Sequence, residues 1–279
     1  MPVKPFAQSW LFTPGWQPEH FNEGVKSGAQ ALLLDLEDSV APDKKAMARD
    51  SVVAFLAKPR PKNVVVAVRV NAMGGQFGPE DMAALKTAPP DYVLLPKIER
   101  PEQLDLGHHL LIGAPKPVGL LALIESSRGV GHIEALVEDS AHLDGMMFGS
   151  ADYTADLGQS LGALRTEHAR SRIVNAAAMR HLPAIDSPFF DLDDEQGLLA
   201  DCASARFIGF TAKAAVHPNQ LDSIHRAFAR APEEIARARR ILAAKMDGVT
   251  VLDGRMIDAA LVRWAKRILP DEAAALEVR

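Results

Sequence analysis

The sequence alternates short apolar runs with segments of helical spacing along most of its length, and this alternation constrains the fold more than any other feature. We place the apolar runs at residues 9–12, 31–36, 64–70, 92–96, 118–124, 143–148, 183–186 and 206–211. Runs such as ALLLDL and VVVAVRV are almost continuously apolar, which is typical of parallel strands covered on both faces. Repeated strand–helix units of this kind favour a closed barrel over a doubly wound sheet. The sequence therefore predicts an α/β fold of the TIM (β/α)8 barrel type.

The domain organisation follows from the absence of a break in this alternation. The 279 residues fall in the range of a single barrel, and no low-complexity linker divides them. We expect a catalytic barrel domain over residues 1–245 and a C-terminal helical extension over residues 246–279. The segment LDGRMIDAALVRWAKRIL in the extension contains one more amphipathic helix than a barrel needs. We expect that helix to cap the barrel or to reach a neighbouring subunit.

Composition excludes several classes of function. A hydrophobic fraction of 48% with 24% charged residues describes a globular protein with a large core. The net charge of −5, without a long basic run, argues against a nucleic-acid partner. Cys202 is the single cysteine, so intramolecular disulfides and thiolate metal clusters are excluded. The N-terminus has no signal-like apolar stretch and the apolar runs are strand-sized, so we expect a cytoplasmic protein without a membrane partner.

Charged and polar residues collect at the C-terminal ends of the predicted strands. Run by run they are Asp35, Glu37 and Asp38, Arg69 and Asn71, Lys97 and Glu99, Glu125, Asp152, Asp186, and Lys213 and His217. In a (β/α)8 barrel these ends meet on one face, where catalytic groups lie in nearly all such enzymes. A single charge there often begins a loop or caps a helix. Capping does not account for Arg69 and Lys97 inside strand-like segments, so we predict an active site on this face.

Glu125 and Asp152 form the candidate metal site. They follow or end the apolar segments LLALIE and GMMFGSAD. Carboxylate oxygen suits Mg²⁺ and leaves coordination positions for water and substrate. Zinc is less suited, because no cysteine or paired histidine is near. The alternative is that both carboxylates hold Lys97 and Arg69 in a structural ion-pair network.

Arg69 is the candidate substrate-binding cation. It ends VVVAVR, a segment too apolar to hold a charge without a partner. Its planar guanidinium fits a carboxylate with two hydrogen bonds, and beside a metal it would bind a 2-oxo acid and stabilise charge as a carbon–carbon bond breaks. A buried salt bridge to Glu37 or Asp38 is the alternative, and the two roles are compatible. We expect Glu37 and Asp38 to orient the cations and the metal-bound waters.

Two further residues have weaker claims. Lys97 would form a Schiff base only with a depressed pKa, and the surrounding carboxylates are expected to raise its pKa instead. We therefore interpret Lys97 as structural. His217, in AVHPNQL, precedes a proline and a helix start, which favours a turn residue over a catalytic base.

In its motifs the chain resembles a known family. The segments LFTPGWQPEHF, LLLDLEDSVAPDKKAMAR, AVRVNAMGG, YVLLPKIE, LLALIESSRGV, MMFGSADYTADLG, GFTAKAAVHPNQL and LDGRMID occur in that order. Over residues 9–269 they resemble the citrate lyase beta-subunit-like branch of the HpcH/HpaI aldolase superfamily. The resemblance implies a TIM barrel that forms a homotrimer or hexamer, uses Mg²⁺, or Mn²⁺ in its place, and acts on small molecules.

The resemblance also implies a reaction. Enzymes of this kind are metal-dependent carbon–carbon lyases that reversibly cleave a 3-hydroxyacyl-CoA of the citryl-, malyl- or citramalyl-CoA class. The products are acetyl-CoA, or another acyl-CoA, and a keto acid. Some members instead couple condensation to thioester hydrolysis.

Family residues carry over onto matching positions of this chain. The metal carboxylates fall on Glu125 and Asp152, and the substrate arginine falls on Arg69, with Glu125 also near the substrate. The family's acidic DLED segment falls on residues 35–38. Its carboxylates keep the supporting role given above to Glu37 and Asp38. The late DGRMID segment ends at Asp258, which the resemblance makes a catalytic acid or base delivered across a subunit interface.

Two positions depart from the family pattern. Gln8 and Gln17 occupy places where the family usually has arginine. Their loss of charge puts a contact to CoA phosphate or substrate carboxylate in doubt. It favours an alternative enzyme, a CoA-independent class II 2-oxo-acid aldolase. A non-catalytic barrel is the other alternative, although Arg69 and the intact metal carboxylates disfavour it.

Overall fold

The computed structural model describes residues 6–59, 61, 63–159, 165–244 and 249–269. Contacts within the chain divide it into two units, Met1–Phe228 and Ala229–Arg279. The division lies upstream of residue 245, where the sequence analysis placed the end of the barrel domain. The helix over residues 232–243 belongs to the second unit because it packs on the helix over residues 259–268. Each unit is described by itself below.

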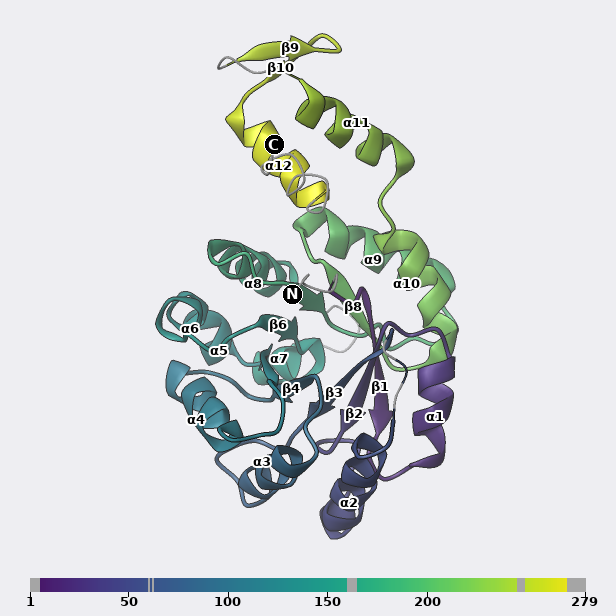
Figure 1. The fold of residues 1–279 in the computed structure, drawn as a ribbon, viewed down its shortest axis with the longest axis vertical. Coiled ribbons are helices and arrows are strands. Elements are labelled where there is room, and N and C mark those ends of the chain that lie inside the picture. Colours follow the sequence, from purple (N-terminus) through teal and green to yellow (C-terminus); the bar gives the residue numbers. More distant parts are fainter. Residues whose placement is uncertain (1–5, 60, 62, 160–164, 245–248, 270–279) are drawn as a thin grey trace. The chain divides into compact units, whose positions relative to one another are not determined.

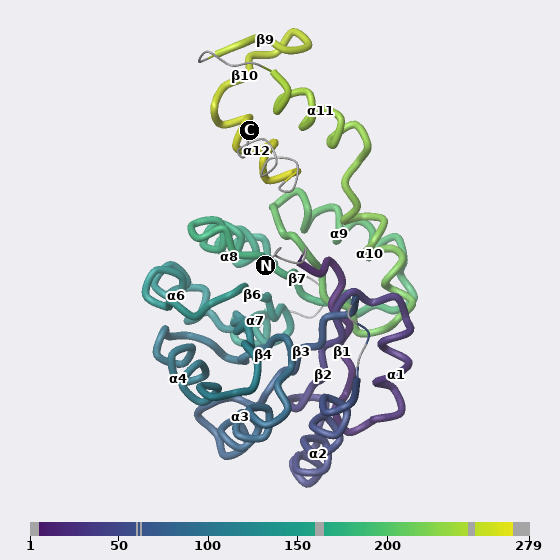
Figure 2. Tube along the Cα trace, viewed as in Figure 1, coloured from purple at the N-terminus to yellow at the C-terminus, as the bar shows by residue number. Residues whose placement is uncertain are grey.

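The first unit is a closed eight-stranded parallel barrel, which confirms the predicted TIM-barrel fold. Its strands are β1 (Ser9–Pro14), β2 (Ala31–Asp35), β3 (Val65–Arg69), β4 (Tyr92–Leu95), β5 (Gly119–Ile124), β6 (Gly145–Phe148), β7 (Ala184–Asp186) and β8 (Ala212–Ala215). They follow one another round the barrel in sequence order, as the colour gradient of the tube shows (Figure 2), and β8 closes on β1.

Helices surround the strands (Figure 1). They are α1 (Glu19–Lys26), η1 (Pro42–Lys44), α2 (Lys45–Leu56), α3 (Phe77–Thr87), α4 (Pro101–Leu111), α5 (Ser127–Gly131), α6 (Ile133–Asp139), α7 (Ser150–Asp156), α8 (Glu167–Met179), α9 (Glu195–Ile208), η2 (Pro218–Gln220) and α10 (Leu221–Phe228). Among the segments with helical spacing, KKAMARDSVVAFLA contains α2 and RTEHARSRIVNAAAMRHL contains α8. None of the described helices is long and apolar enough to span a membrane.

Alternation along the strands separates an inner from an outer core. The inner side chains fill the barrel; they include Trp10, Ala31, Leu33, Ala67, Leu94, Leu121, Leu123, Met147, Ile185, Ala212 and Ala214. Since successive strand residues point to opposite faces, Asp35, Arg69 and Glu125 have the same inward direction as Leu33, Ala67 and Leu123. They are the next inward positions toward the C-terminal ends of their strands. The fold thus brings these three charges to one end of the packed barrel interior.

The eighth strand begins later than the sequence analysis predicted. Residues 206–211 were expected to form it, but α9 continues to Ile208 and β8 begins at Ala212. Phe207 is 93% exposed, and Gly209, with a φ of 117°, ends the helix in the left-handed region. The apolar run was the last turn of an amphipathic helix, whereas the true strand, AKAA, has small residues and a lysine.

The second unit contains α11 (Pro232–Ala243), β9 (Thr250–Leu252), β10 (Arg255–Ile257) and α12 (Ala259–Ile268). Its small core joins both helices to β10 through Ala238, Ile241, Ile257 and Ala265. The hairpin between β9 and β10 was not predicted. It turns at Asp253 and Gly254, whose φ angles of 50° and 71° suit a two-residue turn of the type that favours Asp-Gly.

Candidate active site

A cavity of about 400 Å³ opens at the C-terminal ends of the barrel strands. It is lined by Phe12, Thr13, Pro14, Asp35, Asp38, Ser39, Arg69, Leu123, Glu125, Met147, Phe148, Gly149, Ser150, Ala151, Asp152, Pro188, Phe190 and Val216. The predicted residues Arg69, Asp38, Glu125 and Asp152 therefore share one cavity on the predicted face.

Arg69 is held by three carboxylates of the β2 end. Its Nε and Nη2 donate to the two oxygens of Asp35 at 2.7 and 2.8 Å. Its Nη1 lies 3.1 Å from a carboxylate oxygen of Asp38 and 3.1 Å from Oε2 of Glu37. Burial alone would raise the pKa of Asp35, but the charge and hydrogen bonds of Arg69 bring the pKa below its usual value. The expected salt bridges exist, and Arg69 still lines the cavity.

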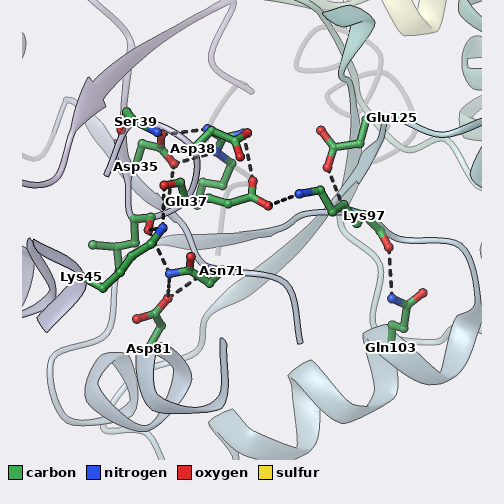
Figure 3. A network of polar contacts seen from close by, with 12 residues as sticks. Asp35, Glu37, Asp38, Ser39, Lys45, Asn71, Asp81, Lys97, Gln103 and Glu125 are labelled. Atoms are coloured by element: carbon green, nitrogen blue, oxygen red, sulfur yellow. Dashed lines mark hydrogen bonds and ion pairs between the residues drawn. The ribbon is translucent and has the colours of Figure 1, made fainter. Parts of the chain in front are cut away.

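Glu37 links Arg69 to Lys97. It is 5% exposed, and its Oε1 accepts a hydrogen bond of 3.0 Å from the Lys97 ammonium. Burial and the neighbouring Asp38 charge raise the pKa of Glu37, against the lowering effect of Arg69 and Lys97. Burial lowers the pKa of Lys97, but the hydrogen bond and charge of Glu37, together with the charges of Asp38 and Glu125, outweigh burial, so the net pKa is raised, as the sequence predicted. Figure 3 shows Glu37 pointing toward the Lys97 ammonium, and Lys97 beside Glu125.

The main chain of Lys97 positions Glu125. Its N–H donates to Oε1 of Glu125 at 2.8 Å, and its φ of 54° lies in the left-handed region that non-glycine residues rarely adopt. The carbonyl of Lys97 accepts a hydrogen bond from Gln103 of α4 at 3.1 Å (Figure 3). This turn therefore fixes one oxygen of Glu125 from behind and leaves the other for the cavity.

Glu125 packs against Gly149 and lines the same cavity as Asp152. A Cβ at Gly149 would lie 2.6 Å from Cβ and 2.8 Å from Oε2 of Glu125, so only glycine permits this approach. Burial, followed by the charges of Glu37 and Asp152, raises the pKa of Glu125 to about 8. Asp152 lies in the first turn of α7 and is exposed. Two carboxylates that repel each other at one cavity fit a divalent cation, because it would relieve that repulsion.

The number of carboxylates indicates the kind of metal. Within the described part of the chain, no three His, Cys, Asp or Glu side chains are grouped to hold an ion. Glu125 and Asp152 could supply two carboxylate ligands, and water and substrate would then complete the coordination shell. Mg²⁺ is commonly bound in this way, through one or two carboxylates, whereas structural zinc sites use four protein ligands.

Asp186 and Lys213 do not join this site, so the prediction that they do was wrong. Their neighbours Ile185, Ala212 and Ala214 point into the barrel, so both side chains point outward. The fully buried Lys213 ammonium lies 2.6 Å from Asp186 and 2.5 Å from Asp201 of α9. Because alternate residues of a strand point to opposite faces, Asp186 and Lys213 lie outside the barrel wall and away from the cavity.

Two other predicted positions have structural partners. Glu99 accepts a hydrogen bond from Ser126 at 2.7 Å. His217 caps η2, where its Nδ1 accepts from the N–H of Asn219 at 3.2 Å, which agrees with a turn residue. The sequence analysis missed Gly149, although a glycine directly after a buried strand is a signal for close approach. It also missed Phe12, whose ring centroid lies 5.2 Å from Cζ of Arg69.

Comparison with known proteins assigns the chain to a family. A model of the HpcH/HpaI aldolase/citrate lyase family matches residues 8–218. A second model, for carbon–carbon bond lyases of the TIM-barrel fold, matches residues 164–275. The chain belongs to the HpcH/HpaI aldolase and citrate lyase family. It is a carbon–carbon lyase of that family.

Similar proteins in the family include a citrate lyase subunit and a malyl-CoA lyase. The beta subunit of citrate lyase from Escherichia coli is 32% identical, over 94% of this chain and 92% of that protein. The L-malyl-CoA/beta-methylmalyl-CoA lyase of Cereibacter sphaeroides is 30% identical, over 93% and 92%. The structure of CitE from Mycobacterium tuberculosis with magnesium, acetoacetate and coenzyme A is 30% identical. It has a TM-score of 0.78 and covers 98% of this chain and 100% of that one.

The two departures from the family pattern lie in different places. Gln8 precedes β1, at the N-terminal ends of the strands, and its side chain donates to the carbonyl of Phe228 at 3.1 Å. That glutamine therefore lies at the opposite end of the barrel from the cavity. Gln17 lies in the loop that follows β1, on the cavity side. Its neighbour Trp16 packs under Lys44 of η1, whose Nζ lies 4.2 Å from the Trp16 ring centroid.

Asp258 belongs to the second unit of this lyase. It is the N-cap of α12, where its Oδ1 accepts hydrogen bonds from the N–H groups of Ala260 and Leu261 at 2.9 and 3.1 Å. Capping fixes one oxygen of the carboxylate and leaves the second oxygen without a contact within the cap.

Proposed function

We propose that this chain is a Mg²⁺-dependent lyase that reversibly cleaves a 3-hydroxyacyl-CoA into an acyl-CoA and a keto acid. The observation that carries the proposal is the pairing of Glu125 and Asp152 at one cavity with Arg69 beside them. Such a site binds the oxygens of a keto acid and stabilises the negative charge that develops as the bond breaks. The magnesium and coenzyme A held by the M. tuberculosis relative support the same chemistry here.

In this proposal Glu125 and Asp152 hold Mg²⁺, for which Mn²⁺ can substitute. The bound ion supplies Lewis-acid polarisation of the substrate's keto or hydroxyl oxygen. Arg69 binds the carboxylate of the keto-acid half, and Asp35, Glu37 and Asp38 keep its guanidinium in place.

Cleavage must also move protons. The substrate hydroxyl gives its proton to water, the carbon–carbon bond breaks, and the electron pair of that bond passes to the acyl-CoA carbon, which becomes an enolate. Asp258 then gives that carbon a proton; in the condensing direction it removes one. We assign Asp258 to the active site of another copy in a homotrimer or hexamer, as the family resemblance implies.

The site is tested by the binding of keto acids with and without Mg²⁺. Binding is measured as a change in the midpoint of thermal unfolding. A ligand that binds the native state raises the midpoint by mass action. We expect glyoxylate or pyruvate to raise it only with Mg²⁺, and acetyl-CoA to increase the shift further. The Asp152→Asn variant should lose the Mg²⁺-dependent shift. A shift with Mg²⁺ and keto acid that acetyl-CoA leaves unchanged would favour the CoA-independent aldolase, and no shift with any combination would refute the metal site.

The placement of Asp258 has its own test in mixed oligomers. Asp258→Asn and Arg69→Ala subunits are each expected to be inactive alone. If Asp258 serves a neighbouring copy, co-expressed mixtures regain part of the activity, because some sites combine an intact Arg69 with an intact Asp258. Mixtures that stay inactive, although the oligomers contain both variants, would contradict an intersubunit role.

A further inference from the structure

We infer that the keto acid handled by this active site has a single carboxylate and a small apolar substituent, as pyruvate and 2-oxobutyrate do. A dicarboxylic keto acid such as oxaloacetate is disfavoured. The inference rests on the proposed function and narrows its substrate class. Two features of the cavity carry it: the distribution of charge, and the strands that supply the apolar wall.

The cavity offers little positive charge to a second carboxylate. Among the residues that the structure describes, Arg69 is the one cation in its lining, and four carboxylates line it as well, namely Asp35, Asp38, Glu125 and Asp152. The Lys97 ammonium lies 3.0 Å from Glu37, outside the lining. An added anion therefore meets a net negative wall, and like charges at close range repel strongly in a partly buried site.

Arg69 is itself largely occupied by the protein. Its Nε and Nη2 bind both oxygens of Asp35, and its Nη1 lies within 3.1 Å of Glu37 and Asp38. A guanidinium has five N–H donors, so these contacts leave it capacity for one more anionic group at most. That group is the carboxylate next to the keto carbon. A carboxylate elsewhere on the substrate finds no partner on Arg69.

One wall of the cavity is apolar. It is formed by Phe12 and Pro14 of β1 and by the segments that follow β7 and β8, which supply Pro188, Phe190 and Val216 to the lining; these three strands are consecutive in the barrel. Phe12 brings this wall up to the guanidinium, since its ring centroid is 5.2 Å from Cζ of Arg69. A methyl or ethyl group gains free energy by burial against such side chains. A carboxylate there loses its hydration without gaining a hydrogen bond.

A matched pair of ligands separates charge from size. Oxaloacetate and 2-oxobutyrate have the same carbon skeleton, and oxaloacetate has a carboxylate where 2-oxobutyrate has a methyl group. We would measure dissociation constants of both, and of pyruvate, by calorimetry on the full chain in saturating Mg²⁺, with oxaloacetate freshly dissolved. We expect pyruvate and 2-oxobutyrate to bind at least roughly tenfold more tightly than oxaloacetate.

A substitution in the apolar wall tests independently whether that wall sets the preference between the two keto acids. Val216 lies directly after β8, is 36% exposed and lines the cavity. Val216→Lys introduces a cation on that wall and should raise the affinity for oxaloacetate relative to 2-oxobutyrate by roughly fivefold or more. Val216→Met, which changes shape without charge, should leave the ratio near that of the unmodified chain. Thermal midpoints establish that both variants are folded.

The outcomes distinguish the inference from the proposal beneath it. Oxaloacetate binding as tightly as 2-oxobutyrate to the unmodified chain overturns the inference, since a further cation must then reach the cavity from elsewhere. An unchanged ratio in a folded Val216→Lys variant overturns the role of the apolar wall. Absence of Mg²⁺-dependent binding for every keto acid overturns the proposed function itself.

Discussion

Replacing Glu125 by Gln should stabilise the metal-free protein while it removes the Mg²⁺ site. The pKa of Glu125 rises from 4.5 to about 8 on folding, first through burial and then through the charges of Glu37 and Asp152. A carboxyl group with a raised pKa lowers the stability of the folded state as pH rises from the unfolded to the folded pKa, because the unfolded chain releases the proton first. Gln is nearly isosteric with the protonated form and still accepts the Lys97 N–H.

The magnitude follows from the width of that pH window. Between pH 4.5 and 8 the cost of Glu125 grows by about 1.4 kcal/mol per pH unit. At pH 7 Glu125→Gln is therefore more stable than the unmodified chain by about 3 kcal/mol, or roughly 6–12 °C in thermal midpoint for a domain of this size. At pH 4.5 the difference should be close to zero.

The assay is thermal unfolding of both proteins in EDTA from pH 4.5 to 8.5, repeated with excess Mg²⁺. Mg²⁺ should raise the midpoint of the unmodified chain and leave Glu125→Gln unchanged. Asp152→Asn is the matched control: its side chain is exposed, so it should alter metal-free stability by less than about 0.5 kcal/mol yet lose the Mg²⁺ response. A Glu125→Gln variant that is no more stable than the unmodified chain at pH 7 would refute the reasoning about burial and repulsion.

Three further substitutions follow from the same geometry. Gly149→Ala should weaken Mg²⁺ binding, measured by calorimetry, and lower the free energy of unfolding by about 1–3 kcal/mol, because the added Cβ would displace Glu125. An unchanged Mg²⁺ affinity would contradict the close contact between Gly149 and Glu125. Lys213→Met removes the ammonium from Asp186, which keeps two hydrogen bonds from Arg170, so the free energy of unfolding in denaturant should fall by about 1–3 kcal/mol; an unchanged value would contradict the stabilising role of the buried Lys213–Asp186 pair. Lys97→Gly should be more stable than Lys97→Ala by about 1 kcal/mol in denaturant unfolding, because alanine keeps the left-handed strain; equal stability would show that the strain is relieved elsewhere.

Most of the fold could be predicted because parallel strands buried on both faces leave a strong pattern. The runs at β2, β3 and β5 are almost continuously apolar, and a charged residue stands at or directly after the end of each run. The eighth strand could not be found in that way, since its AKAA segment includes Lys213, whose buried charge depends on distant partners in β7 and α9. The hairpin of the second unit did carry a local signal, the Asp253–Gly254 pair, that the analysis did not use.

The site was predictable where residue type alone carries the chemistry. Arg69 and Glu125 stand out as charges in apolar strands, and the structure places both at the cavity. Whether a charge after a strand points into the barrel depends on parity, and parity depends on the exact strand register. For that reason Asp186 and Lys213 were grouped with the site, although they pack outside the barrel. Asp258 was nominated by family resemblance alone, because its local sequence is that of an ordinary helix cap.

Cleavage of thioesters is the most direct test of the central claim. The full chain would be incubated with citramalyl-CoA, malyl-CoA and citryl-CoA, in EDTA and in Mg²⁺, and the CoA esters separated by chromatography. We predict conversion of citramalyl-CoA or malyl-CoA to acetyl-CoA and its keto acid with Mg²⁺, none in EDTA, and none for Asp152→Asn under either condition. Conversion that proceeds equally well in EDTA, or Mg²⁺-loaded protein that cleaves none of the three, would contradict a metal-dependent CoA-ester lyase.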